Sequence, residues 1–155
     1  MTTYSFTVQG QWAGGRQGKG QLNASGIQSA ISVDTSMGGQ GIGTNPDELL
    51  IASLQSCYLM TLGIHLELNN VPYHSIEIRS EGVVSDEGGL HFESITHYPI
   101  LVLEAQASDT IYKRAEDVLP KAEEHCMIAK ALKGNVHIHI YPTLIRHGGE
   151  KQHEE

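Results

Sequence analysis

The most regular hydrophobic pattern in the chain is a long apolar segment over residues 49–66. It contains no Asp, Glu, Lys or Arg, and its apolar residues would fall on every side of a helix, which is typical of a helix buried in a core. Asn45 is a good N-cap, Pro46 suits the first helical position, and Glu48 stands where an acid completes a capping box. The pattern therefore predicts one long central helix over 46–70.

Around this helix, apolar and polar residues alternate with the period of β-strands. The alternation predicts strands over 4–9, 27–33, 74–84, 90–104 and 135–145. Pro99 indicates an edge or bulge position in its strand. A second helical region covers 109–133, with Asp109 or Ser108 as cap and a break or bend at Pro120. Strands, long helix, strands, helices and a final strand, in this order, predict an α+β fold with a largely antiparallel sheet.

The 155 residues are enough for one domain with a buried core. We expect that domain to cover residues 1–146 and to be followed by a polar, disordered tail over 147–155. A net charge of −8 argues against nucleic acid or an anionic membrane as a partner, since either would require clustered Lys and Arg.

The central helix is long enough to raise the question of a membrane span. Polar residues such as Ser53 and Ser56 interrupt it and no basic anchors flank it, so we expect a core helix and no membrane partner. The chain starts directly with strand-like sequence instead of a signal peptide, and it has two cysteines. We therefore expect a cytoplasmic protein, in which cysteines are more often catalytic or metal-bound than structural.

Two glycine-rich segments, 10–20 and 38–43, match neither a P-loop nor a dinucleotide-binding fingerprint. One interpretation is that both are simple turns. The other is that the first segment carries Arg16 to an interior anion. Both interpretations stay open on the pattern alone.

Cys57 and Cys126 are the candidate reactive side chains, although either would also suit a buried apolar position. Cys126 would lie near a helix N-terminus if a helix restarts just before it, which favours a thiolate, but two acidic residues precede it and oppose ionisation. Cys57 lies in the middle of its helix, where an ordinary thiol with a pKa near ~8.5 is only slightly ionised at neutral pH. To act as a nucleophile it would need a cation, for which Arg16 is the strongest candidate.

Three motifs resemble the family of osmotically inducible protein C and organic hydroperoxide resistance proteins (OsmC/Ohr). They are Gly14-Gly15-Arg16-Gln17-Gly18, Thr44-Asn45-Pro46-Asp47-Glu48-Leu49-Leu50 followed by Ser56-Cys57, and Cys126 followed by Ala131-Leu132-Lys133-Gly134-Asn135-Val136. The resemblance extends to about Ile145. It implies an OsmC/Ohr-like α+β fold with a mostly antiparallel sheet, a long buried central helix and an intertwined homodimer with active sites at the subunit interface.

The resemblance also implies an activity, the thiol-dependent reduction of organic hydroperoxides in oxidative stress defence. By matching position, Cys57 is the peroxidatic cysteine, Cys126 the resolving cysteine that forms a redox-active disulfide with it, and Arg16 the arginine that polarises thiolate and peroxide. No metal or other cofactor is implied. The reductant is an external dithiol, by resemblance a lipoyl protein.

Two positions depart from the family pattern. The acid that orients the arginine falls at Asp47, where glutamate is usual, and the neighbouring Glu48 is the alternative; Met127 stands where proline often follows the resolving cysteine. Ten helical residues at ~1.5 Å each put Asp47 roughly 15 Å from Cys57 along one axis. An acid–arginine pair would therefore reach Cys57 by a fold-back of the chain or from a second subunit.

Two other function classes stay open. Nine histidines and two cysteines could supply a metal site: His137 and His139 share a face of the last predicted strand, and His125 adjoins Cys126. However, the sequence has no compact Cys-x-x-Cys or His-Glu-x-x-His spacing. The other alternative is a non-enzymatic small-molecule-binding or stress-response protein on the same fold.

Overall fold

The computed structural model describes residues 1–149, so most of the predicted tail over 147–155 lies outside the described residues. The chain divides into two compact units, Met1–Leu50 and a second that starts at Ile51. The boundary falls inside the long helix, and the assignment of residues 1–146 to a single domain stays a prediction. Helices and sheets occur together in the order that an α+β fold requires, as predicted.

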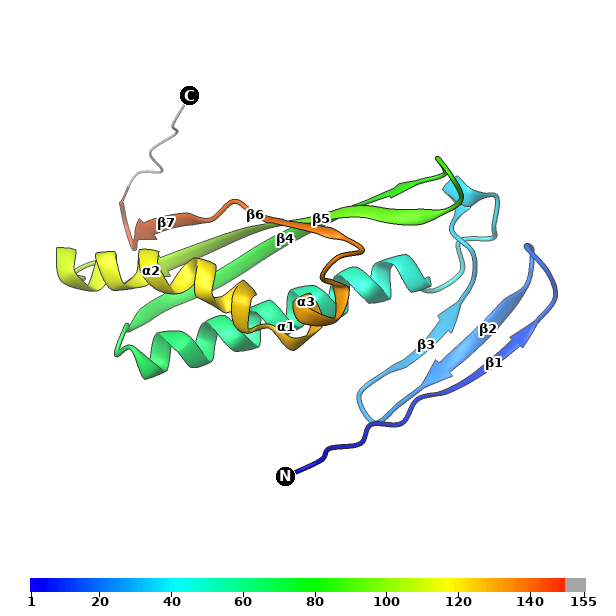
Figure 1. Cartoon of the computed structure of the whole chain (residues 1–155), viewed down its shortest axis with the longest axis horizontal. Helices are drawn as coiled ribbons and strands as arrows, with labels where there is room; N and C mark the ends of the chain where they lie inside the picture. Colours follow the sequence, from blue (N-terminus) through cyan, green and yellow to red (C-terminus); the bar gives the residue numbers. More distant parts are fainter. Residues whose placement is uncertain (150–155) are drawn as a thin grey trace. The chain divides into compact units, whose positions relative to one another are not determined.

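The first unit contains a three-stranded antiparallel sheet in the order β1-β2-β3 (Figure 1). Its strands are β1 (Gln9–Ala13), β2 (Lys19–Asn23) and β3 (Gln28–Ile31), followed by a short 3-10 helix, η1 (Thr35–Met37). The turn between β1 and β2 uses Gly14 at a φ of +99°, a left-handed conformation that favours glycine. The segment 10–20, predicted as a turn, therefore consists mainly of two strand ends and a tight turn between them.

The predicted first strand over 4–9 is wrong in position. Residues 1–8 form no strand, and the side chains of Tyr4, Phe6 and Val8 are exposed. A segment of alternating apolar and polar residues forms a strand only where a neighbouring strand hydrogen-bonds to its backbone N–H and C=O groups. In this chain that pairing begins at Gln9, which lies opposite Asn23.

The predicted central helix is confirmed as α1 (Pro46–Leu68). The side chain of Asn45 accepts a hydrogen bond from the N–H of Glu48 at 2.8 Å, which is the expected N-cap. The Glu48 carboxylate accepts from the hydroxyl of Thr44 at 2.8 Å, a different partner from the one in a full capping box. The start of α1 is thus fixed by local hydrogen bonds within four residues of sequence.

Only one stripe of α1 is buried within this chain. The buried residues are spaced by four: Leu54, Tyr58, Leu62 and Leu66. Met60, Ile64 and Leu68 expose 69%, 55% and 71% of their surface. The prediction of burial on every side therefore fails for the single chain. By length and composition alone α1 could also cross a membrane, a property it shares with core helices of soluble proteins.

The second unit is built on a mixed sheet around its longest central strand. β4 (Tyr73–Ser85) and β5 (His91–Leu103) form an antiparallel hairpin, and β6 (His137–Ile140) and β7 (Thr143–Arg146) pair in parallel with the other edge of β5. The single strand predicted over 135–145 is therefore two shorter strands. Both are parallel to β5, an orientation that alternation cannot indicate.

Pro99 lies in the interior strand β5, which corrects the prediction of an edge position. On the side of β5 that faces β6 and β7, the paired residues are 94–97 and 100–103. Pro99 falls in the gap between these two ladders, where no neighbouring strand needs its missing N–H. The proline thus explains why two short strands replace one long strand here.

Two helices follow the hairpin, α2 (Asp109–His125) and α3 (Met127–Leu132). Ser108 caps α2 by accepting from the N–H of Ile111 at 3.3 Å. Of the break or bend predicted at Pro120, the break is wrong, because α2 continues through Pro120 to His125 and is capped by Cys126. Pro120 and Glu116, whose carbonyl loses its helical partner, both lie on the exposed side, where water can replace that hydrogen bond.

The core of the second unit lies between the helices and one face of the sheet. Figure 1 shows α1 and α2 on the same side of the β4–β7 sheet. The buried cluster joins α1, β5 and α2 and consists of Tyr58, Leu62, Leu66, Val71, Leu101, Leu103, Ala115, Val118, Leu119 and Ala122. This packing fixes α1 against the end of α2, and therefore positions the two cysteines.

Candidate active site

The two cysteines come together where α1 meets the turn between α2 and α3. Cys126 is both the C-cap of α2 and the N-cap of α3, with an extended backbone (φ −66°, ψ 118°). Its sulfur accepts a hydrogen bond from the N–H of Ala129 at 3.4 Å. Cys126 is buried and Cys57 is half-buried, and both are free thiols. Cys57 is therefore the more accessible of the two sulfurs.

The pKa of Cys57 is lowered by hydrogen bonds, in spite of its burial. Burial on its own raises the pKa of Cys57. Hydrogen bonds lower it by more than burial raises it, and their donors are the thiol of Cys126, the backbone N–H groups of Ile128 and Met127, and the hydroxyl of Thr61. The N–H groups belong to the first turn of α3, which has no helical partners for them. The need for a cation at Cys57 is thus met in part by backbone donors of the same unit.

The pKa of Cys126 moves in the opposite direction, to about 11. Burial raises it, and the hydrogen bond to Cys57 raises it further because donating that bond keeps the proton on Cys126. The start of α3 does favour a thiolate at Cys126, since the N–H groups of Ala129 and Ile128 lower its pKa, but burial and Cys57 outweigh them. The pair is therefore polarised: Cys57 is the more readily ionised sulfur, and the thiol of Cys126 donates to it.

The other predicted site residues lie in the first unit. Arg16 is exposed in the turn between β1 and β2, where its Nη1 donates to the carbonyl of Met37 at 2.7 Å. Asp47 and Glu48 occupy the first turn of α1. Within residues 1–149 no ion pair joins Arg16 to either acid. The roles of these three residues at Cys57 therefore stay predictions.

Thr61 is a candidate site residue that the sequence pattern did not predict. It lies one helical turn after Cys57 on α1, and its hydroxyl lowers the pKa of Cys57 by donating to the sulfur. The spacing of four residues on a helix was the available signal, because such residues are neighbours on one face. The α3 N–H groups gave no sequence signal, since every residue except proline carries one.

A buried polar network lies behind α1. Gln55 Nε2 donates to the Ser80 hydroxyl at 3.0 Å, and Ser80 Oγ lies 2.6 Å from Nδ1 of the fully buried His97. The Ser80 hydroxyl and Nδ1 share one hydrogen bond, and Nε2 is a buried atom without a partner among the described residues. Burial lowers the pKa of His97 to about 4. Through Ser80, the neutral imidazole of His97 connects β4 and β5 to Gln55 of α1, which lies two residues before Cys57.

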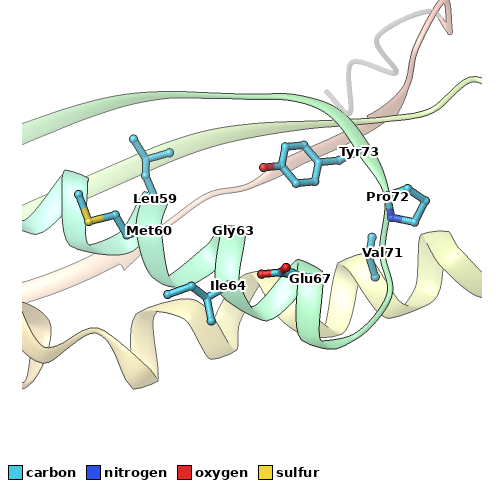
Figure 2. Close-up of a pocket in the computed structure, with 8 residues that line it drawn as sticks. All are labelled: Leu59, Met60, Gly63, Ile64, Glu67, Val71, Pro72 and Tyr73. Atoms are coloured by element: carbon cyan, nitrogen blue, oxygen red, sulfur yellow. The ribbon is translucent and has the colours of Figure 1, made fainter.

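An apolar groove runs along the exposed side of α1 and has a volume of about 730 Å³. It is lined by Leu59, Met60, Gly63, Ile64, Glu67, Val71, Pro72 and Tyr73. Figure 2 shows Met60, Ile64 and Glu67 projecting from the helix, while Tyr73 reaches over it from the chain that follows. Glu67 is the one charged side chain in this lining. Such a surface suits an apolar partner.

Histidine, cysteine and acidic side chains are the residues that could ligate a metal ion. Among residues 1–149 they form no group of three or more that could hold a metal ion.

Comparison with known proteins agrees with this geometry. Residues 38–140 match the family described as OsmC-like protein. The Bacillus subtilis protein named uncharacterized protein YmaD is 32% identical over 151 residues, which cover 97% of this chain and 100% of that protein. The Staphylococcus saprophyticus organic hydroperoxide resistance protein-like 2 is 27% identical over 139 residues, covering 82% of this chain and 87% of that protein.

A solved structure shows the same fold. The organic hydroperoxide resistance protein OsmC of Legionella pneumophila superimposes with a TM-score of 0.72 at 20% identity, and the match covers 91% of this chain and 99% of that one. The family match covers both cysteines and the cap of α1. The chain therefore belongs to the OsmC-like protein family.

Proposed function

We propose that this protein is a cysteine-based peroxidase that reduces organic hydroperoxides to alcohols. One observation carries the proposal: two free cysteines that hydrogen-bond to each other, with the pKa of Cys57 lowered and the pKa of Cys126 raised. A peroxide-reducing nucleophile must be a thiolate, and its resolving partner must keep its proton until the second step. The directions of the two pKa shifts support these roles.

The reaction follows in three balanced steps. The Cys57 thiolate attacks the distal oxygen of ROOH, the O–O bond breaks, and the alkoxide takes a proton to leave as ROH, so that Cys57 becomes a sulfenic acid. The Cys126 thiol then displaces the sulfenic oxygen as water and forms a Cys57–Cys126 disulfide. An external dithiol reduces this disulfide by exchange and is itself oxidised to a disulfide.

In this proposal the donors that lower the pKa of Cys57 also act during the first step. The N–H groups of Met127 and Ile128 and the hydroxyl of Thr61 are preorganised around the sulfur, so they stabilise the nucleophile without reorganising. Arg16 adds a guanidinium that polarises the peroxide, oriented by Asp47 or Glu48. The support for this second part is the arginine-loop motif and the acidic first turn of α1.

An alkyl hydroperoxide suits the surroundings better than H2O2. Met127, whose backbone N–H serves Cys57, exposes 69% of its surface, and it offers an apolar side chain to a substrate chain. One relative is named organic hydroperoxide resistance protein-like 2. The reductant in this proposal is a dithiol such as a lipoyl protein, acting in a reducing cytoplasm.

We also propose a homodimer as the active form. The first unit buries Gly18, Ser32 and Asn45 but no large apolar side chain, so its sheet has no core of its own. In the second unit, Met60, Ile64 and Leu68 leave an apolar strip on α1. Exposed apolar surface of this kind marks an interaction site. Sedimentation equilibrium should therefore give a dimer, and a fully active monomer would contradict the dimer proposal without affecting the thiol chemistry.

The activity is tested by steady-state turnover with dihydrolipoamide as reductant. We expect kcat/KM to be larger for cumene hydroperoxide than for H2O2, Cys57→Ser to abolish turnover, and Cys126→Ser to stop it after the first step. Undiminished turnover in Cys57→Ser would refute the proposed function. Equal kcat/KM for both peroxides would refute the preference for organic substrates.

A further inference from the structure

A second pair of side chains faces each other across α1 and α2, beyond the two cysteines. His65 lies eight residues after Cys57 on α1, and His125 is the last residue of α2. Their ring centroids are 4.8 Å apart with an interplanar angle of 43°. His65 is half-buried and His125 is exposed, so the pair is open to solvent at one side. The proposed peroxidase steps use neither residue.

The hydrogen bonding of His125 determines which of its nitrogens is free. Its Nδ1 lies 2.8 Å from the carbonyl oxygen of Lys121. A carbonyl only accepts, so Nδ1 carries the proton and Nε2 keeps its lone pair in the neutral ring. A ring N–H fixed on a backbone carbonyl is also the arrangement that supports metal-binding histidines, because it sets the tautomer and the ring orientation. Within residues 1–149 the ring nitrogens of His65 make no hydrogen bond, and they are free to join Nε2 of His125.

The distance between the rings fits two ligands of one ion. Imidazole nitrogen binds Zn²⁺ at about 2.0–2.1 Å, which places the ring centroids of two ligands of one tetrahedral ion about 5 Å apart. The 4.8 Å between His65 and His125 agrees with that value. His74 and His147 form another pair, but their centroids are only 3.9 Å apart and their planes are closer to parallel, at 30°. That pair is too close for two ligands of one ion, and it provides a matched control.

We propose that His65 and His125 form a two-histidine site for a divalent transition-metal ion such as Zn²⁺. Neutral imidazole suits late first-row ions, and the net charge of −8 favours the approach of a cation. Two protein ligands leave the remaining coordination positions to water, so the ion is exchangeable. Because Cys126 follows His125 directly, a bound ion ties the segment that carries this thiol to α1.

Zinc titration of the full-length, tag-free and reduced protein by calorimetry tests the site. We expect the wild type to bind one zinc equivalent that His65→Gln and His125→Gln each weaken at least tenfold. His74→Gln should bind zinc as the wild type does. Cys57→Ser distinguishes zinc bound by the thiols from zinc bound by the histidines, and we expect this variant to keep the histidine-dependent equivalent. Zinc should also raise the Tm of the wild type but not that of His125→Gln.

Two results would overturn the site. One is unchanged zinc affinity and stoichiometry in both His65→Gln and His125→Gln. The other is loss of the same equivalent in Cys57→Ser with no effect of the histidine variants. His125 is exposed, so His125→Gln should fold even if His65→Gln does not, and it then decides the question alone. Peroxidase turnover is not part of this readout, so its failure and the failure of the metal site are distinguishable.

Discussion

Replacing Met127 by proline should remove one hydrogen-bond donor from Cys57 and leave the fold intact. Met127 is the first residue of α3, and proline is well tolerated at the first position of a helix because its N–H has no helical partner. The preceding residue, Cys126, already has a ψ of 118°, which is close to the extended conformation required before proline. The substitution therefore deletes an N–H from the backbone with little strain.

The size of the effect follows from the charge on the acceptor. A hydrogen bond to a charged group contributes about 1.5–3 kcal/mol, and we use the lower end because sulfur is a weak acceptor. The loss of the Met127 N–H should then reduce the ionised fraction of Cys57 roughly tenfold at any pH below its midpoint, since 1.4 kcal/mol is about a factor of ten. The Thr61, Ile128 and Cys126 donors remain, so Cys57 should still react.

The rate of Cys57 alkylation by iodoacetamide as a function of pH measures this change. The midpoint of the rate profile should move to higher pH in Met127→Pro. Met127→Ala removes the same side chain but keeps the N–H, so its profile should match that of the wild type. Identical profiles for Met127→Pro and Met127→Ala would refute the assignment of this N–H to Cys57. Circular dichroism of both variants verifies that α3 and its surroundings still fold.

Three further predictions concern neighbouring features. Thr61→Val should shift the Cys57 alkylation profile to higher pH while Thr61→Ser should not, because the serine keeps the hydroxyl that lowers the pKa of Cys57. The free energy of unfolding should fall as the pH drops below the ordinary histidine pKa of 6.5 towards about 4, because His97 takes up a proton in the unfolded chain but not in the buried site. Urea unfolding should show a decrease of up to roughly 3 kcal/mol over this pH window, and His97→Gln should show a smaller decrease. Gly82→Ala should lower the unfolding free energy by about 1–3 kcal/mol, because the new Cβ would lie 2.6 Å from Ile51 Cδ1, whereas Gly26→Ala, with nothing within 4 Å, should leave it nearly unchanged.

The features that the sequence predicted well are those that depend on local hydrogen bonds and short spacings. The start of α1 was predictable because Asn45 accepts a hydrogen bond from Glu48 within one turn and Pro46 suits the first helical position. Ser108 as the N-cap of α2 and the turn between β4 and β5 also depend on local sequence. The two cysteines were identified by resemblance, and the structure brings them together at the end of α2.

The errors occurred where tertiary pairing decides the outcome. Pro120 does not break α2, because its side of the helix faces solvent. Pro99 sits in an interior strand, because β6 and β7 leave a gap beside it. The lowered pKa of Cys57 depends on where α3 begins relative to α1, and backbone N–H groups carry no residue-specific signal that could have indicated this.

The most direct test of the central claim is the intact mass of the protein after one equivalent of cumene hydroperoxide, followed by peptide mapping without reduction. The Cys57–Cys126 scheme predicts a loss of two hydrogens in the wild type and a single cross-linked peptide pair that contains both cysteines. It also predicts a stable gain of one oxygen at Cys57 in the Cys126→Ser variant. A wild-type protein that reduces the peroxide without forming this disulfide, or an oxygen gained at Cys126 instead of Cys57, would contradict it.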